Sequence, residues 1–232
     1  MRPFESAPPK MTHTLRALAW LLRYPDAGLR AVAPQLGDAL KAEAALDASR
    51  LAELDALAHQ IAQAAPLRTE AEYVELFDRG RRTALHLFEH VHGDSRDRGP
   101  AMVDLAQTYD RAGLLLAPGE LPDYLPVVLE FASTQPPAAA REFLRETAHI
   151  VRAVMSALLE HGSPYASVLA AVLDLAGERA DPVPLAAEPA LDESWQEPEA
   201  FGGCSSAGQS RPNEPQPVHI VRPARAPHRT AV

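Results

Sequence analysis

The sequence predicts an all-α protein, with a single compact multi-helix, bundle-like domain followed by a disordered Pro-rich C-terminal tail. Ala, Leu, Glu and Arg dominate the first 180 residues, and these residues favour helices. β-branched and aromatic residues rarely alternate with polar ones, so the two-residue period of strands is nearly absent. About eight helices with short connections describe one bundle-like domain.

Two helices are expected in the first 46 residues. Thr12 or Thr14 caps the first helix, which carries a stripe of leucines on one face. The second helix runs from about residue 28 to 46. We expect it to be weak, because Pro34 and Gly37 interrupt it.

Two further helices precede the centre of the chain. Ser49 caps one of them, and its apolar residues recur at helical spacing until Pro66. Thr69 begins the other, because Glu72 follows it at the spacing of a capping box.

The second half of the chain is expected to hold four helices. Ser95 or Asp97 starts the first of these, and a linker rich in Pro and Gly follows it. A short helix covers residues 125–131. Pro137 and Pro164 lie in the first turns of the last two helices, where a missing backbone N–H costs nothing.

Composition divides the chain into three parts. We expect residues 1–11 to form a flexible extension, residues 12–180 the helical domain and residues 181–232 a disordered tail. The tail is rich in Pro, Gly, Ser and Gln, and it offers too little apolar area to offset the entropy of ordering. The single cysteine, Cys204, lies in this tail, so no disulfide can form within the chain.

Charge and hydropathy restrict the location and the partners. The first ten residues lack the apolar core of a secretory signal, and no apolar run approaches the roughly 18 residues of a membrane span. We therefore expect a cytoplasmic protein with no membrane span. The net charge of −9 disfavours nucleic acid as a partner, because nucleic-acid binding needs concentrated Lys and Arg.

Residues 85–105, LHLFEHVHGDSRDRGPAMVDL, form a central block that is rich in reactive side chains. The string HLFEH, which begins at His86, matches an H-x-x-E-H pattern that supplies two zinc ligands in some metalloproteases. A zinc hydrolase with Glu89 as base would also need a third ligand. His92 is too close along the chain, and Gly93 indicates a helix end. Histidines at a helix end and in a polar turn are the favoured interpretation, and no metal or cofactor is expected.

The central block, with YDRAGL at 109–114 and ELPDYLPVVLEF at 120–131, resembles the signature of nitrate reductase assembly chaperones of the delta-subunit, or NarJ, type. This family belongs to a wider all-helical superfamily of redox-enzyme maturation chaperones. YVELF at 73–77 and the ELPDY string resemble the Y-x-x-L-F and E-x-P-D-H elements of that superfamily. Tyr124 stands where the superfamily has histidine, so no role of that histidine is carried over.

The resemblance implies a non-catalytic chaperone. Members of this family bind the apo catalytic subunit of respiratory nitrate reductase, including its N-terminal peptide, and support molybdenum cofactor insertion and iron–sulfur cluster loading before membrane attachment. Proteins of molybdenum cofactor biosynthesis are further candidate partners. Two alternative functions stay open. In these alternatives the chain is either a zinc-dependent hydrolase or a permanent scaffold of a membrane redox complex.

We expect a peptide-binding groove beside the central block, with an apolar wall and an acidic rim. A change in histidine protonation would alter the charge of this rim. The candidate residues are Leu87, Phe88, Glu89, His90, His92, Asp94, Asp97, Asp123 and Tyr124. The alternatives are core packing for the apolar residues, helix capping or local ion pairs for the acids, and ordinary hydrogen bonding for the histidines.

Overall fold

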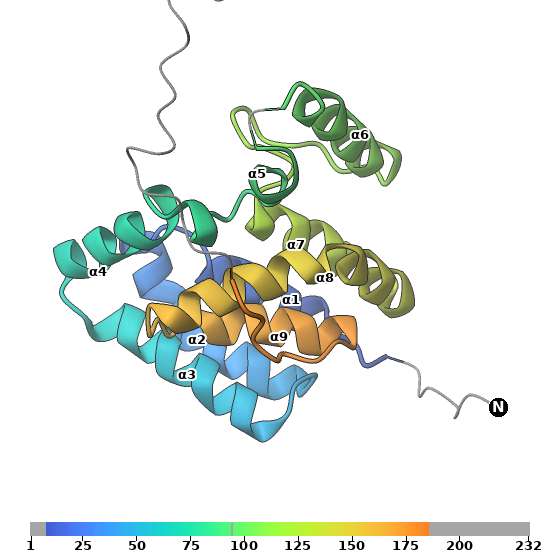
Figure 1. Cartoon of the computed structure of the whole chain (residues 1–232). Helices are drawn as coiled ribbons and strands as arrows, with labels where there is room; N and C mark the ends of the chain where they lie inside the picture. The colour runs from blue at the N-terminus through green and yellow to red at the C-terminus, as the bar shows by residue number, and fades with distance from the viewer. Residues whose placement is uncertain (1–7, 94, 186–232) are drawn as a thin grey trace, which may run out of the picture. The chain divides into compact units, whose positions relative to one another are not determined.

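The computed structural model describes residues 8–93 and 95–185, and these residues form nine α-helices (Figure 1). The all-α prediction is confirmed, because the only β pairing among the described residues is one isolated bridge. Asp94 and the predicted tail after residue 185, with Cys204, lie outside the described residues. The helices are α1 (Thr12–Leu21), α2 (Ala27–Glu43), α3 (Ala48–Gln63), α4 (Pro66–Tyr73), α5 (Leu87–His92), α6 (Arg98–Arg111), α7 (Leu125–Thr134), α8 (Pro137–Glu160) and α9 (Ala166–Ala176).

The core lies where α1, α7, α8 and α9 meet. Helix α8 packs along α9, and α1 packs against both α7 and α2 (Figure 1). Leu18, Leu129 and Leu169 are fully buried there, and the α7 and α9 sequences are apolar over most of their length. Within the described ranges, no helix combines the length and the apolar character needed to cross a membrane.

Helix α1 is capped by a carboxylate from another helix, and not by Thr12 or Thr14 as predicted. Glu43, the last residue of α2, accepts the backbone N–H groups of His13 (3.2 Å) and Thr14 (2.7 Å). Burial alone would raise the pKa of the Glu43 carboxyl, but the hydrogen bonds from Thr14 and His13 outweigh burial and lower this pKa. The contact ties the end of α2 to the start of α1.

Helix α2 runs without a break through Pro34 and Gly37, where the sequence predicted an interruption. Asp26 caps the helix by accepting the backbone N–H of Leu29 at 2.8 Å. Gly37 is buried against α3, and a Cβ at this position would overlap the Asp55 carboxylate. The glycine thus permits a close approach of two helices, and this packing outweighs its low helix propensity.

The starts of α3 and α4 also differ from the prediction. Asp47 caps α3 by accepting a backbone N–H at 2.8 Å, and Ser49 lies inside the first turn. Helix α4 begins at Pro66, three residues before Thr69. The Thr69 hydroxyl donates to the Ala65 carbonyl at 3.1 Å, so it does not cap the helix.

Replacing Glu43 should give an acid-dependent loss of stability. The pKa of Glu43 is lower in the folded chain than its usual value of 4.5, so the ionised carboxylate stabilises the fold above that value. This contribution disappears as the pH falls through the folded pKa. Glu43→Gln should therefore lower the free energy of unfolding by about 0.5–1 kcal/mol at pH 7, the low end for a cap because the carboxylate is partly exposed.

The difference between wild type and Glu43→Gln should shrink toward pH 3, as measured by urea unfolding followed by circular dichroism. Asp38→Asn, at an exposed position of the same helix, is the control and should change little at either pH. A deficit of equal size at both pH values would contradict the cap.

Candidate functional site

The central block is joined to the elbow of residues 121–124 by a short antiparallel bridge. The backbone N–H of Leu87 donates to the Asp123 carbonyl at 3.0 Å, and the N–H of Leu125 donates to the Leu85 carbonyl at 2.8 Å. The two segments are more than 30 residues apart in the sequence, so this bridge fixes how the central block sits on the start of α7.

The Asp123 side chain caps helix α5 from outside that helix. Its carboxylate is fully buried and accepts the backbone N–H of Phe88 at 3.1 Å. His86 Nδ1 lies 3.4 Å from one carboxylate oxygen, and the Arg98 guanidinium lies 3.8 Å from the other. A negative charge at a helix N-terminus is favourable. The prediction that Asp123 lies on an exposed acidic rim is therefore wrong, because its carboxylate holds α5 in place.

The predicted apolar wall belongs largely to the core. Leu87 is 2% exposed and packs in the main core, as the core alternative expected. Phe88 and Tyr124 are partly buried and pack against that core. The Tyr124 ring also lies 5.2 Å from the His86 ring, centroid to centroid. Leu87 thus stabilises the fold, and only Phe88 and Tyr124 keep accessible surface.

Glu89 and Asp97 of the central block are exposed. The Glu89 carboxylate pairs with Arg98 at 3.3 Å. Asp97 stands at the N-cap position of α6 without a side-chain cap bond, and its carboxylate accepts a hydrogen bond from the Ser95 hydroxyl at 3.3 Å. Asp94 lies outside the described residues. Glu89 and Asp97 therefore stay candidates for contact with a basic partner.

The histidines make local contacts. His90 Nε2 donates to the Ala84 carbonyl at 2.9 Å, and the His92 ring meets the edge of Phe88 at 5.5 Å. Among residues 8–93 and 95–185, no three His, Cys, Asp or Glu side chains are placed to hold a metal ion. The geometry thus agrees with the hydrogen-bonding interpretation of His90.

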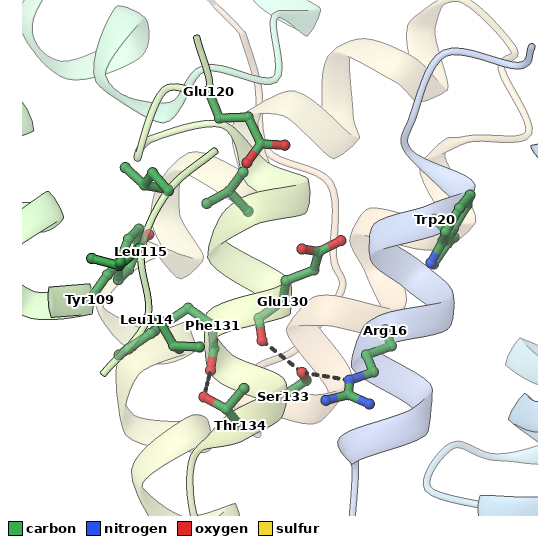
Figure 2. A pocket seen from close by; sticks show the side chains of 12 residues that line it. Arg16, Trp20, Tyr109, Leu114, Leu115, Glu120, Glu130, Phe131, Ser133 and Thr134 are labelled. Atoms are coloured by element: carbon green, nitrogen blue, oxygen red, sulfur yellow. Dashed lines mark hydrogen bonds between the residues drawn. The ribbon is translucent and has the colours of Figure 1, made fainter. Parts of the chain in front are cut away.

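A groove that the sequence did not reveal lies between α1 and α7, and we call it the α1–α7 groove (Figure 2). Its volume is about 380 Å³, within the range of roughly 300–1,000 Å³ that is typical of ligand sites. Tyr109, Val127 and Phe131 form an apolar cluster on one side, with the Tyr109 and Phe131 rings 4.6 Å apart. The Tyr109 hydroxyl donates to the Pro122 carbonyl at 2.8 Å. This hydrogen bond holds a residue that lines the groove against the elbow.

Exposed apolar side chains edge the groove on both sides. Trp20 of α1 is 37% exposed, and Leu115 in the loop before the elbow is 87% exposed. Figure 2 shows the two on opposite sides of the groove. Because so much apolar area faces water, a partner with apolar side chains would gain free energy by covering it.

Two carboxylates complete the edge of the α1–α7 groove. Glu120 comes from the loop and Glu130 from α7, and both are exposed (Figure 2). Arg23 lies 3.8 Å from the Glu130 carboxylate and also stacks over the Trp20 ring at 5.0 Å. An exposed pair at that distance is weak, so Glu130 can exchange it for a basic group of a partner.

The hydroxyl groups that line the α1–α7 groove are engaged in hydrogen bonds within the chain. Besides the Tyr109 hydroxyl, Ser133 donates to the Glu130 carbonyl (2.6 Å) and Thr134 donates to the Phe131 carbonyl (2.7 Å). Arg16 donates to the Ser133 hydroxyl at 3.3 Å. No base lies within hydrogen-bond reach of either hydroxyl in the described residues, as nucleophilic catalysis would require.

Sequence reasoning missed this groove for identifiable reasons. Trp20 falls beside the leucine stripe of the first helix, where the sequence favours a core position. The residues after 113 were interpreted only as a linker. The run LLL at residues 114–116 was the available signal, because a loop gains nothing by exposing three leucines unless they cover or receive an apolar surface.

Comparison with protein families gives one match. The family described as nitrate reductase delta subunit matches residues 24–171, which is more than half of the chain. The span includes the central block, the elbow and all of α7, and it leaves out α1, which carries Trp20.

Several curated proteins are similar over most of the chain. The nitrate reductase molybdenum cofactor assembly chaperone NarJ of Escherichia coli K12 is 39% identical over 187 residues, which cover 76% of this chain and 79% of that protein. The probable assembly chaperone NarW of the same strain is 40% identical and covers 70% and 68%. The probable NarJ of Bacillus subtilis 168 is 36% identical and covers 69% and 86%.

A solved structure with a similar fold supports this architecture. It is the crystal structure of a proposed redox enzyme maturation protein from Archaeoglobus fulgidus, with a TM-score of 0.51 and 21% identity over 72% of this chain and 94% of that one. The curated relatives are named as assembly chaperones, a non-catalytic class. The zinc hydrolase alternative is therefore set aside, and the chain is not an enzyme.

Removing the Asp123 carboxylate should weaken the attachment of α5. Asp123→Ala leaves the buried N–H of Phe88 without an acceptor and should lower the free energy of unfolding by about 1–3 kcal/mol. Amide hydrogen exchange should speed up in α5 more than in α9. Asp104→Asn, at an exposed position of α6, is the matched control and should stay within about 0.5 kcal/mol of wild type. Unchanged protection of α5 in Asp123→Ala would rule out the cap.

Proposed function

The chain belongs to the nitrate reductase delta subunit family, and from this premise we propose that it binds the apo catalytic subunit of a respiratory nitrate reductase. A chaperone role in nitrate reductase assembly is common to its named relatives. The more specific proposal is that it holds the catalytic subunit in the cytoplasm while the molybdenum cofactor and the iron–sulfur clusters are inserted, and that it leaves before membrane attachment.

The observation that carries this proposal is the α1–α7 groove, where exposed apolar residues lie beside two carboxylates. We propose that it receives the N-terminal peptide of the catalytic subunit. The peptide would lie as an amphipathic helix, with its apolar side chains on the Tyr109 and Phe131 cluster and its basic side chains near Glu120 and Glu130.

The groove suits a complex that must form and then dissociate. Trp20 and Leu115 supply apolar contact area, and buried apolar area drives association. The carboxylates are exposed, so they guide encounter and orientation more than they add affinity. Such a surface can bind a peptide at moderate strength without a large rearrangement of the fold.

The predicted central-block residues would form a second contact region in this proposal. Glu89 and Asp97 are exposed, and Phe88, His92 and Tyr124 keep part of their surface accessible. We propose that they contact the catalytic subunit outside its N-terminal peptide, because they do not line the α1–α7 groove. Leu87 and Asp123 would act indirectly, by holding this region in position.

Peptide binding should depend on the edge of the α1–α7 groove. Trp20→Ala should weaken binding of the synthetic N-terminal peptide of the catalytic subunit about tenfold, since tryptophan is enriched among the residues that carry most of the energy at interfaces. Glu130→Lys should also weaken it, and by less at high salt. Calorimetric titration measures both effects.

Glu146→Lys makes the same charge change at an exposed position of α8 and is the control, with binding expected to stay near wild type. Helical content should be unchanged in all three variants. Wild-type affinity in both Trp20→Ala and Glu130→Lys would show that the peptide binds elsewhere.

A chaperone binds the immature catalytic subunit and then leaves it, whereas a permanent scaffold stays bound to the mature complex. The tagged chain should recover the catalytic subunit from cells blocked in molybdenum cofactor synthesis, and should recover little of it when the complex is mature. Metal analysis of the recovered subunit gives the readout. Stoichiometric recovery with the mature, cofactor-loaded complex would favour the scaffold.

A further inference from the structure

A pocket of about 420 Å³ lies between α3, α8 and α9, and we call it the α3–α9 pocket. None of its lining residues lines the α1–α7 groove. Small and apolar side chains form most of the lining, among them Ala56 of α3, Met155 of α8 and Ala170 of α9. The pocket is therefore a separate site on the helical bundle.

The α3–α9 pocket offers apolar area and little free charge. Leu159 lines it and is 48% exposed, so part of a large apolar side chain faces water there. Its charged lining residues in the described ranges, Arg50 and Glu53, form an ion pair, and Arg50 also pairs with Asp174 at 2.9 Å. An apolar group would gain more free energy in this pocket than an ion would, because the guanidinium is already paired.

After α9 the chain runs along α8, and Figure 1 shows this segment in orange. The Arg152 guanidinium of α8 donates to the Arg179 carbonyl at 3.1 Å, and the Ser156 hydroxyl accepts the backbone N–H of Val183 at 3.0 Å. Arg152 and Ser156 are about one helical turn apart, so the segment follows α8 toward its C-terminal end. These hydrogen bonds fix the path of residues 179–183.

This path brings the chain to the α3–α9 pocket. Ala180 lines the pocket and packs against the core. Met155 and Leu159, which also line it, lie close to Ser156 on the same stretch of α8. Leu185, the last described residue, is half-buried. The described part of the chain thus ends a few residues beyond a wall of the pocket.

The sequence after Leu185 supplies large apolar side chains within a short distance. The stretch LDESWQEPEAF at 191–201 is the first that carries them, in the form of Leu191, Trp195 and Phe201. Ten residues of extended chain span about 33–36 Å, whereas the five residues from Ala180 to Leu185 span at most about 18 Å. The chain between Leu185 and Trp195 is therefore long enough for Trp195 to return to the pocket.

We propose that the α3–α9 pocket receives the Trp195 side chain of the same chain, and that residues 191–201 lie across the pocket. A tryptophan buries roughly 150–250 Å² of surface, and here it would cover the exposed face of Leu159. The carboxylates on either side of Trp195 stay in water. The helical domain supplies the apolar surface that the segment itself lacks.

The covalent link makes a weak contact sufficient. Trp195 is joined to Ala180, a wall of the pocket, through about 15 residues, so its effective concentration at the pocket is on the order of millimolar. A second copy of the chain or another protein would have to reach that concentration in solution to compete. Docking at this pocket also leaves the α1–α7 groove free for a client peptide, because the two share no lining residue.

Tryptophan fluorescence of the full chain tests this proposal. The chain has two tryptophans, Trp20 and Trp195, so Trp20→Phe leaves Trp195 as the only source of indole emission. Its emission maximum should lie at a shorter wavelength than that of N-acetyl-tryptophanamide, and acrylamide should quench it several-fold less. Emission and quenching equal to those of the free amide would overturn the proposal.

A charge placed in the pocket should release Trp195. Ala56 lines the pocket at an exposed position of α3, so Ala56→Glu should keep the fold. In the Trp20→Phe chain this carboxylate should raise the quenching of Trp195 several-fold, because an indole ring would have to bury it. Ala52→Glu, about one turn earlier at an exposed position that does not line the pocket, is the matched control and should leave the emission unchanged.

Leu159→Gln is a second test variant, at an exposed position of α8, and it should raise the quenching by less. Equal helical content by circular dichroism shows that the variants fold. Wild-type quenching in both Ala56→Glu and Leu159→Gln, or an equal rise in Ala52→Glu, would refute the contact.

Dilution of the protein separates the own chain from a second copy. Quenching that stays constant on dilution is expected, whereas quenching that rises on dilution would mean that another copy supplies Trp195 and would refute an intramolecular contact. These measurements contain no client peptide, so their outcome stands apart from that of the peptide titrations.

Discussion

The buried carboxylate of Asp123 is the contact on which the functional half of the molecule depends. It lies in the elbow before α7, and it accepts the first free N–H of α5 while His86 and Arg98 approach from the central block. A fully buried acid is costly unless positive or donor groups surround it. Because these groups all come from the central block, separating that block from α7 would leave the charge unpaired.

This constraint reaches two of the cavities, the α1–α7 groove and a cavity of about 290 Å³ lined by Tyr24, Tyr73 and Tyr124, which we call the aromatic cavity. Tyr109 reaches the Pro122 carbonyl from the floor of the α1–α7 groove, and Tyr124 forms part of the aromatic cavity. Fixing residues 121–124 therefore sets the shape of both. The acids that face water, such as Glu89 and Glu130, are separate from the acid that holds the fold. Structure and binding thus use different carboxylates, and surface acids can vary without loss of the fold.

The helical class could be predicted because leucine spacing and proline placement are local properties of the sequence. The caps of α1 and α5 and the site could not, because their partners come from elsewhere in the chain. Glu43 replaces Thr12 at the start of α1 only because α2 ends beside it. Aspartate is usually found at the surface, so the sequence places Asp123 there. Its carboxylate is buried because it accepts a hydrogen bond from a residue about 35 positions away. Trp20 lies beside a core stripe in sequence, yet it stands at the edge of a groove that three segments build.

Tyr124 lies between the α1–α7 groove and the aromatic cavity. Its ring packs against the apolar cluster under the α1–α7 groove and also lines the aromatic cavity, so the two sites are neighbours across one side chain. A client segment that reaches both would make its second contact intramolecularly, at an effective concentration in about the millimolar range. Neither contact then has to be strong. Losing one of the two contacts would leave the bound segment with only the affinity of the other.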